Sequence, residues 1–289
     1  MKNLKPILIL LSFFAILVLF TSGVSAANWT VNPGDNIQSA INNASENDTV
    51  TINDNNGTDY IYNENVVINK KLQLQTNNGG RVTINALDSS KPVFTINSPG
   101  NGSSIIGFII TGSTGSHGIY VNTNNCQIIG NTISNNGGYG VNVAGTNVTV
   151  INNIVFNNGN AGLVVNGVNA SVKWNNVTFN GNRGFNGWSW DGISVTGANG
   201  TVIGNNVTGN SRSGISVNGA NALVFLNYLV QNGGYGIGVT GANATVINNT
   251  VVDNGNAGIV ITSGDNSTVS NNTVTNNGNR GFNGWSWDG

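Results

Sequence analysis

Few side chains in this sequence could carry out acid–base or nucleophilic chemistry. Charged residues make up 7% of the chain, and there is a single His. From Gly118 onward the carboxylates are Asp191, Asp253, Asp265 and Asp288, which are scattered along the sequence. Glycoside hydrolysis normally requires two carboxylates beside one bond. No such pair stands out, so the sequence predicts no catalytic residue.

The sequence also gives no sign of a metal site or a cofactor. His117 and Cys126 are the only His and Cys, and one of each is too few for a soft-metal site. His117 precedes the first regular repeat and is interpreted as a turn residue rather than as a general base. Cys126 has no partner for an internal disulfide.

Two tryptophan-rich segments are the more informative feature. Residues 182–192 read NRGFNGWSWDG, and residues 279–289 repeat the same eleven letters. Trp beside polar residues can stack on sugar rings while Asp and Asn bond the hydroxyl groups. The candidate ligand-binding residues are Arg183, Trp188, Trp190, Asp191, Arg280, Trp285, Trp287 and Asp288. The alternative is that the Trp side chains fold back and cover neighbouring surface, since exposed Trp is unfavourable.

These segments interrupt an internal repeat. The unit is clearest at residues 236–257, which are 22 residues long and read GIGVTGANATVINNTVVDNGNA. A period of this length is typical of a solenoid, in which each repeat is one coil that buries its apolar face against its neighbours. Close copies begin at Gly118, Gly140, Gly162, Gly192, Gly214 and Gly258.

Each unit contains three short strand patterns. We number positions as offsets from the first Gly of a unit, so that Ile237 has offset 1 in the unit of Gly236. Offsets 1, 3, 10 and 15 are aliphatic in unit after unit. Alternation over such short runs predicts strands with one buried face. Because the connections are too short for helices, the strands must stack on their counterparts one coil away.

Asparagine marks three corners between these strands, at offsets 7, 13 and 18. Asn tolerates the left-handed backbone of a tight turn, and stacked Asn amides can bond along a fibre-like axis. We expect the offset-13 residues to form an internal structural ladder. They are Asn131, Asn153, Asn175, Asn205, Asn227, Asn249 and Asn272.

With three strands and an asparagine ladder per coil, the units resemble the right-handed parallel β-helix family. The Asn-rich and Gly-rich form is most similar to adhesin-like surface proteins of methanogenic archaea. The resemblance covers roughly residues 28–289 and implies an all-β fold. It says little about function, because one fold hosts unrelated functions.

Several Asn-x-Ser/Thr sequons offer sites for N-glycosylation. None of the offset-13 asparagines lies in a sequon, whereas four at offset 7 do. The offset-7 row is therefore the better glycan candidate. Its members are Asn147, Asn169, Asn199 and Asn243.

The chain divides into three parts. Residues 1–26 resemble a signal peptide, because Lys2 and Lys5 precede an apolar run that ends in VSA; an uncleaved anchor is the alternative. Residues 27–117 are expected to hold a capping helix and irregular first coils. In that helix Asp35 and Gln38 resemble a capping box. Residues 118–289 form the regular coils, and we expect them to continue beyond the given C-terminus.

These observations favour a secreted or cell-surface protein with a structural or adhesin-like role. The formal net charge is −1 without a basic stripe, so a nucleic-acid partner is not expected. The expected partner is a cell-surface or extracellular polysaccharide, and no membrane span is expected in the mature chain. The alternative is a polysaccharide lyase or glycoside hydrolase of the β-helix family.

Overall fold

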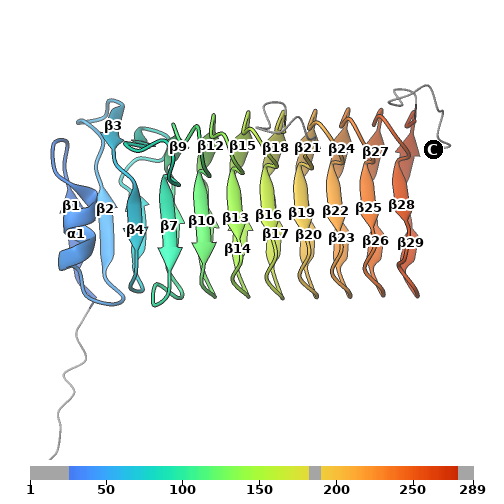
Figure 1. The fold of residues 1–289 in the computed structure, drawn as a ribbon, viewed down its shortest axis with the longest axis horizontal. Helices are drawn as coiled ribbons and strands as arrows, with labels where there is room; N and C mark the ends of the chain where they lie inside the picture. The colour runs from blue at the N-terminus through green and yellow to red at the C-terminus, as the bar shows by residue number, and fades with distance from the viewer. Residues whose placement is uncertain (1–25, 182–189, 279–289) are drawn as a thin grey trace, which may run out of the picture.

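The computed structural model describes residues 26–181 and 190–278, which form a right-handed parallel β-helix (Figure 1). Each regular coil runs through three short strands, and each strand pairs in parallel with its counterpart in the next coil. Three sheets therefore extend along the rod, which confirms the predicted fold. We call them sheets 1, 2 and 3 in the order in which a regular coil visits them.

The strands of each sheet follow one another coil by coil. Sheet 1 contains β4 (Val66–Ile68), β7 (Phe94–Asn97), β10 (Ile119–Asn122), β13 (Val141–Val143), β16 (Leu163–Val165), β19 (Ile193–Val195), β22 (Ile215–Val217), β25 (Ile237–Val239) and β28 (Ile259–Ile261). Sheet 2 contains β1 (Asn28–Val31), β2 (Thr49–Ile52), β5 (Gln73–Thr76), β8 (Ser104–Ile106), β11 (Gln127–Ile129), β14 (Thr149–Ile151), β17 (Ser171–Lys173), β20 (Thr201–Ile203), β23 (Leu223–Phe225), β26 (Thr245–Ile247) and β29 (Thr268–Ser270). Sheet 3 contains β3 (Tyr60–Asn63), β6 (Val82–Asn85), β9 (Ile109–Thr111), β12 (Thr132–Ser134), β15 (Ile154–Phe156), β18 (Asn176–Thr178), β21 (Asn206–Thr208), β24 (Tyr228–Val230), β27 (Thr250–Val252) and β30 (Thr273–Thr275).

The register follows the repeat, because residues at the same offset lie side by side in neighbouring coils. In sheet 1, Val141 pairs with Ile119 on one side and with Leu163 on the other. In sheet 2, Val150 pairs with Val172. The aliphatic side chains at offsets 1, 3, 10 and 15 are fully buried in every regular coil before the last described one. Burial of these apolar columns is the main force that stacks the coils.

The last described coil buries its apolar residues less completely. Ile259, Ile261 and Val274 are partly exposed, and Val269 is 47% exposed. The described residues place a coil on only one side of them, which accounts for this greater exposure.

A short helix, α1 (Ile37–Asn43), covers the opposite end of the core, beside β1 and β2 (Figure 1). Its residues Ile37 and Ile41 are fully buried. Glu64 in the next coil accepts hydrogen bonds from the backbone N–H groups of Ile37 at 2.8 Å and Gln38 at 3.1 Å. Two N–H groups that a helix cannot satisfy by itself are thereby bonded from outside it.

The capping box expected between Asp35 and Gln38 does not form. The N-cap residue is Asn36, whose Oδ1 accepts the backbone N–H of Ser39 at 2.7 Å. Gln38 instead pairs with the edge of β4, where its Oε1 accepts the N–H of Val67 and its Nε2 donates to the same residue's carbonyl. The sequence pattern located the helix correctly, but the cap lies one residue later than expected.

The offset-13 asparagines form a continuous buried row. In Asn153 the backbone N–H and Nδ2 both donate to Oδ1 of Asn175, at 2.9 and 3.0 Å. Its Nδ2 also donates to the carbonyl of Ile128 at 2.9 Å. The same arrangement repeats from coil to coil, so each buried amide is bonded along the rod axis and to a strand carbonyl.

A second internal ladder runs through the offset-18 corner, which the sequence analysis did not assign to a ladder. Its members bond to one another as the offset-13 residues do and are as deeply buried. They are Asn136, Asn158, Asn180, Asn210, Asn232, Asn254 and Asn277. Two rows of buried amides thus accompany the apolar columns, one on each side of sheet 3.

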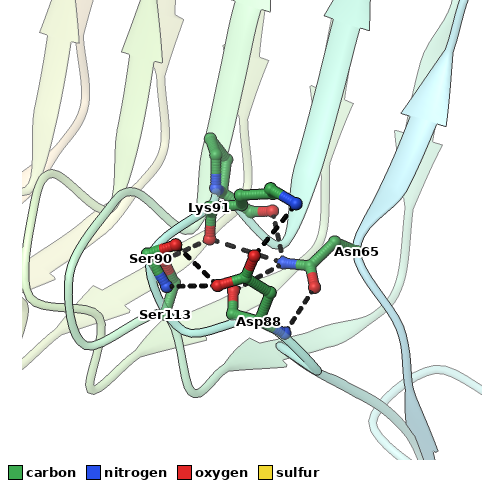
Figure 2. Close-up of polar contacts among 6 residues, drawn as sticks. Asn65, Asp88, Ser90, Lys91 and Ser113 are labelled. Carbon is green, nitrogen blue, oxygen red and sulfur yellow. Dashed lines mark hydrogen bonds and ion pairs between the residues drawn. The ribbon is translucent and has the colours of Figure 1, made fainter.

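A polar cluster holds the irregular corner between β6 and β7 (Figure 2). The Asp88 carboxylate accepts the hydroxyl of Ser90 at 2.6 Å and lies 2.9 Å from Nζ of Lys91. Asn65 bonds both backbone polar groups of Asp88, and Ser113 donates to the carbonyl of Lys91. The Ser90 hydroxyl is the main reason why the pKa of Asp88 falls to about 2. Since these groups bond one another, the cluster is structural.

Candidate functional site

A groove of about 290 Å³ lies on the outer face of sheet 1, across β16, β19, β22, β25 and β28. Its floor is made by the offset-2 residues, whose side chains point outward because neighbouring strand residues alternate. These residues are Val164, Ser194, Ser216, Gly238 and Val260. Because all of them are small, they leave space that a ligand can enter.

Aromatic side chains line one edge of the groove. Tyr139, Trp190 and Tyr235 lie in the segments that lead into β13, β19 and β25. These strands are two coils apart, so their backbones are spaced roughly 10 Å along the rod. The rings of Tyr139 and Trp190 nevertheless meet edge to face, with centroids 5.5 Å apart at an angle of 84°. The edge therefore presents one contacting pair of half-exposed rings, with Tyr235 further along the rod.

The next coil anchors the backbone of Trp190. Its N–H donates to the hydroxyl of Ser211 at 3.0 Å, and its carbonyl accepts the N–H of Arg212 at 3.1 Å. Trp190 is consequently fixed beside the groove, although it directly follows the segment 182–189, which lies outside the described residues.

A charged pair lies at the centre of the same edge. Asp191 is buried, and its Oδ1 accepts the backbone N–H of Ser213 at 3.0 Å. Its Oδ2 lies 3.7 Å from a guanidinium nitrogen of Arg212, whose side chain is largely exposed. Burial raises the pKa of Asp191, and Arg212 counteracts part of this rise. The carboxylate thus holds the guanidinium at the rim, where its remaining N–H groups are free to meet a ligand.

The opposite edge carries short polar side chains. Asn218, Thr240 and Thr262 occupy offset 4 in three successive coils. The hydroxyl of Thr240 donates to Oδ1 of Asn218 at 2.8 Å. Hydroxyl and amide groups in a row can exchange hydrogen bonds with a ligand that carries many hydroxyl groups.

His117 extends the aromatic edge toward the N-terminus. Its ring stacks on Tyr139 with centroids 5.0 Å apart, and its Nδ1 accepts the backbone N–H of Tyr139 at 3.1 Å. Burial lowers the pKa of His117, which favours the neutral ring that this hydrogen bond requires. The residue therefore supports the aromatic edge.

Two of the ligand-binding residues predicted from the sequence, Trp190 and Asp191, lie in this groove. The Asp191 carboxylate accepts the N–H of Ser213 and pairs with Arg212, and its expected bond to a sugar hydroxyl stays a prediction. The remaining candidates fall outside the described residues: Arg183, Trp188, Arg280, Trp285, Trp287 and Asp288.

Sequence reasoning missed Tyr139, Tyr235 and Arg212. These residues stand one or two positions before the first Gly of their units, where the residue type varies from coil to coil. Large side chains at these variable positions were the available signal.

The groove offers binding groups rather than a pair of catalytic carboxylates. Asp191 is the one carboxylate among its lining residues. Within residues 26–181 and 190–278, no three His, Cys, Asp or Glu side chains are grouped closely enough to hold a metal ion.

The four predicted glycosylation sites lie on an exposed ladder at the offset-7 corner. These residues have left-handed backbones, with φ between 54° and 59°. Each Nδ2 donates to Oδ1 of the asparagine in the preceding coil, at 3.0–3.2 Å. They are Asn147, Asn169, Asn199 and Asn243. Their side chains are accessible and already take part in an axial row of hydrogen bonds.

No helix within the described part of the chain has the length and apolar composition needed to cross a membrane.

Comparison with known proteins places these features in context. Residues 191–284 match the family model described as a right-handed beta helix region. A cell surface glycoprotein of Methanothermus fervidus is 37% identical over 126 residues, which is 42% of this chain and 20% of the relative. The chain therefore aligns with about a fifth of that protein's length.

Solved structures share the fold at low sequence identity. The Dettilon tailspike protein superposes with a TM-score of 0.66 at 18% identity, over 84% of this chain and 54% of the tailspike. An alginate lyase from Paenibacillus superposes with a TM-score of 0.62 at 16% identity, over 88% of this chain and 96% of the lyase. This chain is a right-handed parallel β-helix protein, similar over part of its length to a surface glycoprotein of a methanogenic archaeon.

Proposed function

We propose that this chain is part of a cell-surface β-helix protein with an adhesive or structural role, and that its sheet 1 groove binds a carbohydrate polymer. The observation that carries the proposal is the row of Tyr139, Trp190 and Tyr235 along one edge, opposite the polar row that begins at Asn218. Aromatic rings stack on the C–H faces of sugars, and hydroxyl, amide and guanidinium groups bond sugar hydroxyls.

The geometry also suggests how the polymer lies. Tyr139 and Trp190 contact each other, and Tyr235 leads into a strand two coils beyond that of Trp190, roughly 10 Å further along the rod. A polymer lying along the rod would therefore meet the Tyr139–Trp190 pair first and Tyr235 further along. Because the segment 182–192 is repeated at 279–289, the rod would offer a second binding position four coils away, and two weak sites on one polymer gain by effective concentration.

The surface location rests on similarity and on composition. The aligned relative is named a cell surface glycoprotein, and this chain carries many sequons with low charge. Secretion by way of residues 1–26 as a signal peptide belongs to the same proposal.

A polysaccharide lyase or hydrolase is the alternative, since an alginate lyase shares the fold. Binding without cleavage is favoured because the groove has one carboxylate, Asp191, which is held by Ser213 and Arg212. Incubation with the bound polysaccharide separates the two functions. A lyase or hydrolase releases new chain ends, whereas an adhesin leaves the polymer length unchanged.

The central test is a glycan-array screen of the purified protein, followed by titration of the best polysaccharide. We expect Trp190→Ala to weaken binding about tenfold or more, equivalent to about 1.4 kcal/mol, and to leave the unfolding midpoint unchanged. Tyr228→Ala is the matched control, because Tyr228 is an exposed aromatic residue on sheet 3. Equal loss of binding in both variants contradicts the proposed site. If neither the wild type nor Trp190→Ala binds a polysaccharide, and Trp190→Ala has a lower unfolding midpoint, then Trp190 only shields the surface beneath it.

A further inference from the structure

Two aromatic residues on sheet 3 occupy backbone positions that rarely accept bulky side chains. Trp174 and Phe179 flank β18, and both have a φ of 55°. The left-handed region is unfavourable for an ordinary residue, and most other coils place Asn or Gly at these two corners. The side chains are 54% and 53% exposed, so burial compensates for only part of this cost.

Each ring rests on a glycine of the next coil. A β-carbon on Gly204 would overlap the six-membered ring of Trp174, and one on Gly209 would lie 2.6 Å from Cε1 of Phe179. Both glycines also have left-handed backbones. The two rings thus belong to one coil and the two glycines to the next coil. Each ring packs one face against the backbone of its glycine and leaves the other face exposed to solvent.

An N-glycosylation sequon lies between these two glycines. Asn206-Val207-Thr208 forms β21, and Asn206 is exposed on the outer face of sheet 3. The hydroxyl of Thr208 donates to Oδ1 of Asn206 at 3.1 Å. Nδ2 of Asn206 donates to Oδ1 of Asn176 at 3.0 Å, so it points toward the coil that carries the two aromatic residues.

We propose that Asn206 is N-glycosylated and that the first sugars of its glycan lie between the rings of Trp174 and Phe179. The donor would be a sugar linked through phosphate to a lipid. Nδ2 of Asn206 bonds to C1 of the sugar, the bond from C1 to the phosphate oxygen breaks, the lipid phosphate leaves and the amide loses one proton. The remaining N–H keeps its hydrogen bond to Asn176. Apolar faces of the sugars then stack on the rings.

The sequons of Asn176 and of the offset-7 ladder lack this setting. Asn176 is in a sequon too, but the rings of its own coil lean toward Gly204 and Gly209, away from the preceding coil, which carries Ile154 in the same row. The asparagines of the offset-7 ladder stand beside small residues, mostly Gly, Ala, Thr and Val. Among these sequons, Asn206 is the one that lies between two exposed rings held by the fold. This inference concerns sheet 3 and is independent of the groove on sheet 1.

The test is expression of the full chain in a host with an N-glycosylation pathway, followed by glycopeptide mass spectrometry. We expect a glycan on Asn206 that disappears in Thr208→Val, which removes the sequon and keeps Asn206 itself. Thr178→Val, which removes the Asn176 sequon in the adjacent strand, is the matched control and should leave the Asn206 glycan in place. Absence of a glycan on Asn206 overturns the proposal.

The contact with the rings needs a second measurement. Asn suits the left-handed backbone, so Trp174→Asn and Phe179→Asn remove a ring without adding strain. Each should lower the Tm of the glycosylated protein by about 2–4 °C more than that of protein from a host without glycosylation. Equal shifts in both proteins would mean that the rings only cover the backbone. If Trp174→Asn instead abolishes binding of a free polysaccharide by the unglycosylated protein, the rings serve an unattached ligand.

Discussion

Replacing Asn205 with Ala tests whether the buried ladder, and not only the apolar columns, stabilises the rod. Asn205 is 1% exposed. Its Oδ1 accepts the backbone N–H of Asn175 at 2.9 Å and Nδ2 of the same residue at 3.0 Å. Its Nδ2 donates to Oδ1 of Asn227 at 2.9 Å and to the carbonyl of Val172 at 3.0 Å. Alanine removes all four interactions.

The size of the effect follows from the groups left behind. The Asn175 N–H remains buried without its acceptor, and such a group costs about 1–3 kcal/mol. We therefore expect Asn205→Ala to lower the free energy of unfolding by at least about 1–3 kcal/mol. Asn206→Ala is the matched control, because Asn206 is exposed and water can replace its bonds; its effect should stay within about 0.5 kcal/mol.

The measurement is urea unfolding of both variants, made in a host without N-glycosylation so that Asn206 carries no sugar. Asn205→Ala should shift the midpoint to lower urea with little change in slope, because the surface exposed on unfolding stays similar. Equal midpoints for the two variants would refute the reasoning, since the ladder would then contribute no more than a surface amide.

Three further predictions concern single residues. A hydrogen bond from a backbone N–H is the main cause that lowers the pKa of Asp48, so the stability that Asp48 contributes should be lost as pH falls from 3.8 through its folded pKa. Burial raises the pKa of Asp191, so the stability that Asp191 contributes should be lost as pH rises from 3.8 through its folded pKa. Urea midpoints of the wild type and of each Asp→Asn variant, measured across this pH range, check both predictions. Gly219→Ala should lower the free energy of unfolding by about 1–3 kcal/mol, because a β-carbon there would overlap the backbone of the preceding coil. Gly238→Ala, at the open groove floor, should be nearly neutral, and comparable urea midpoints for the two variants would contradict this prediction. Buried Cys126, whose pKa burial raises, should react with a thiol reagent only after unfolding, and reaction in the native state would contradict its burial.

The repeat pattern is sufficient to predict the architecture. A period of 22 residues with aliphatic residues at fixed offsets leaves one way to bury apolar surface, which is to stack equal positions on one another. The observed pairing of Val141 with Ile119 and Leu163 is that stacking. The offset-13 ladder followed from the same reasoning, because only a stack brings Asn153 beside Asn175.

Local chemistry was harder to anticipate because partners from other coils complete it. Glu64 bonds the first N–H groups of α1, and the Gln38 side chain pairs with β4. The offset-18 asparagines were not assigned to a ladder, but their side chains turn inward and bond along the axis, as in Asn158 with Asn180. Neither arrangement is visible within a single unit.

The position of the groove, in contrast, depends on contacts between coils. Tyr139 and Tyr235 are far apart in the sequence and stand where the repeat is otherwise unremarkable, yet the stacking brings both to one edge of sheet 1 around Trp190. The position of the Trp174 ring likewise depends on Gly204, a residue of the next coil on which the ring packs. A repeat sequence specifies the coil, because each coil buries the same apolar positions against its neighbours. The sites arise where departures from the repeat in different coils meet on the surface, and that depends on which coils the stacking makes neighbours.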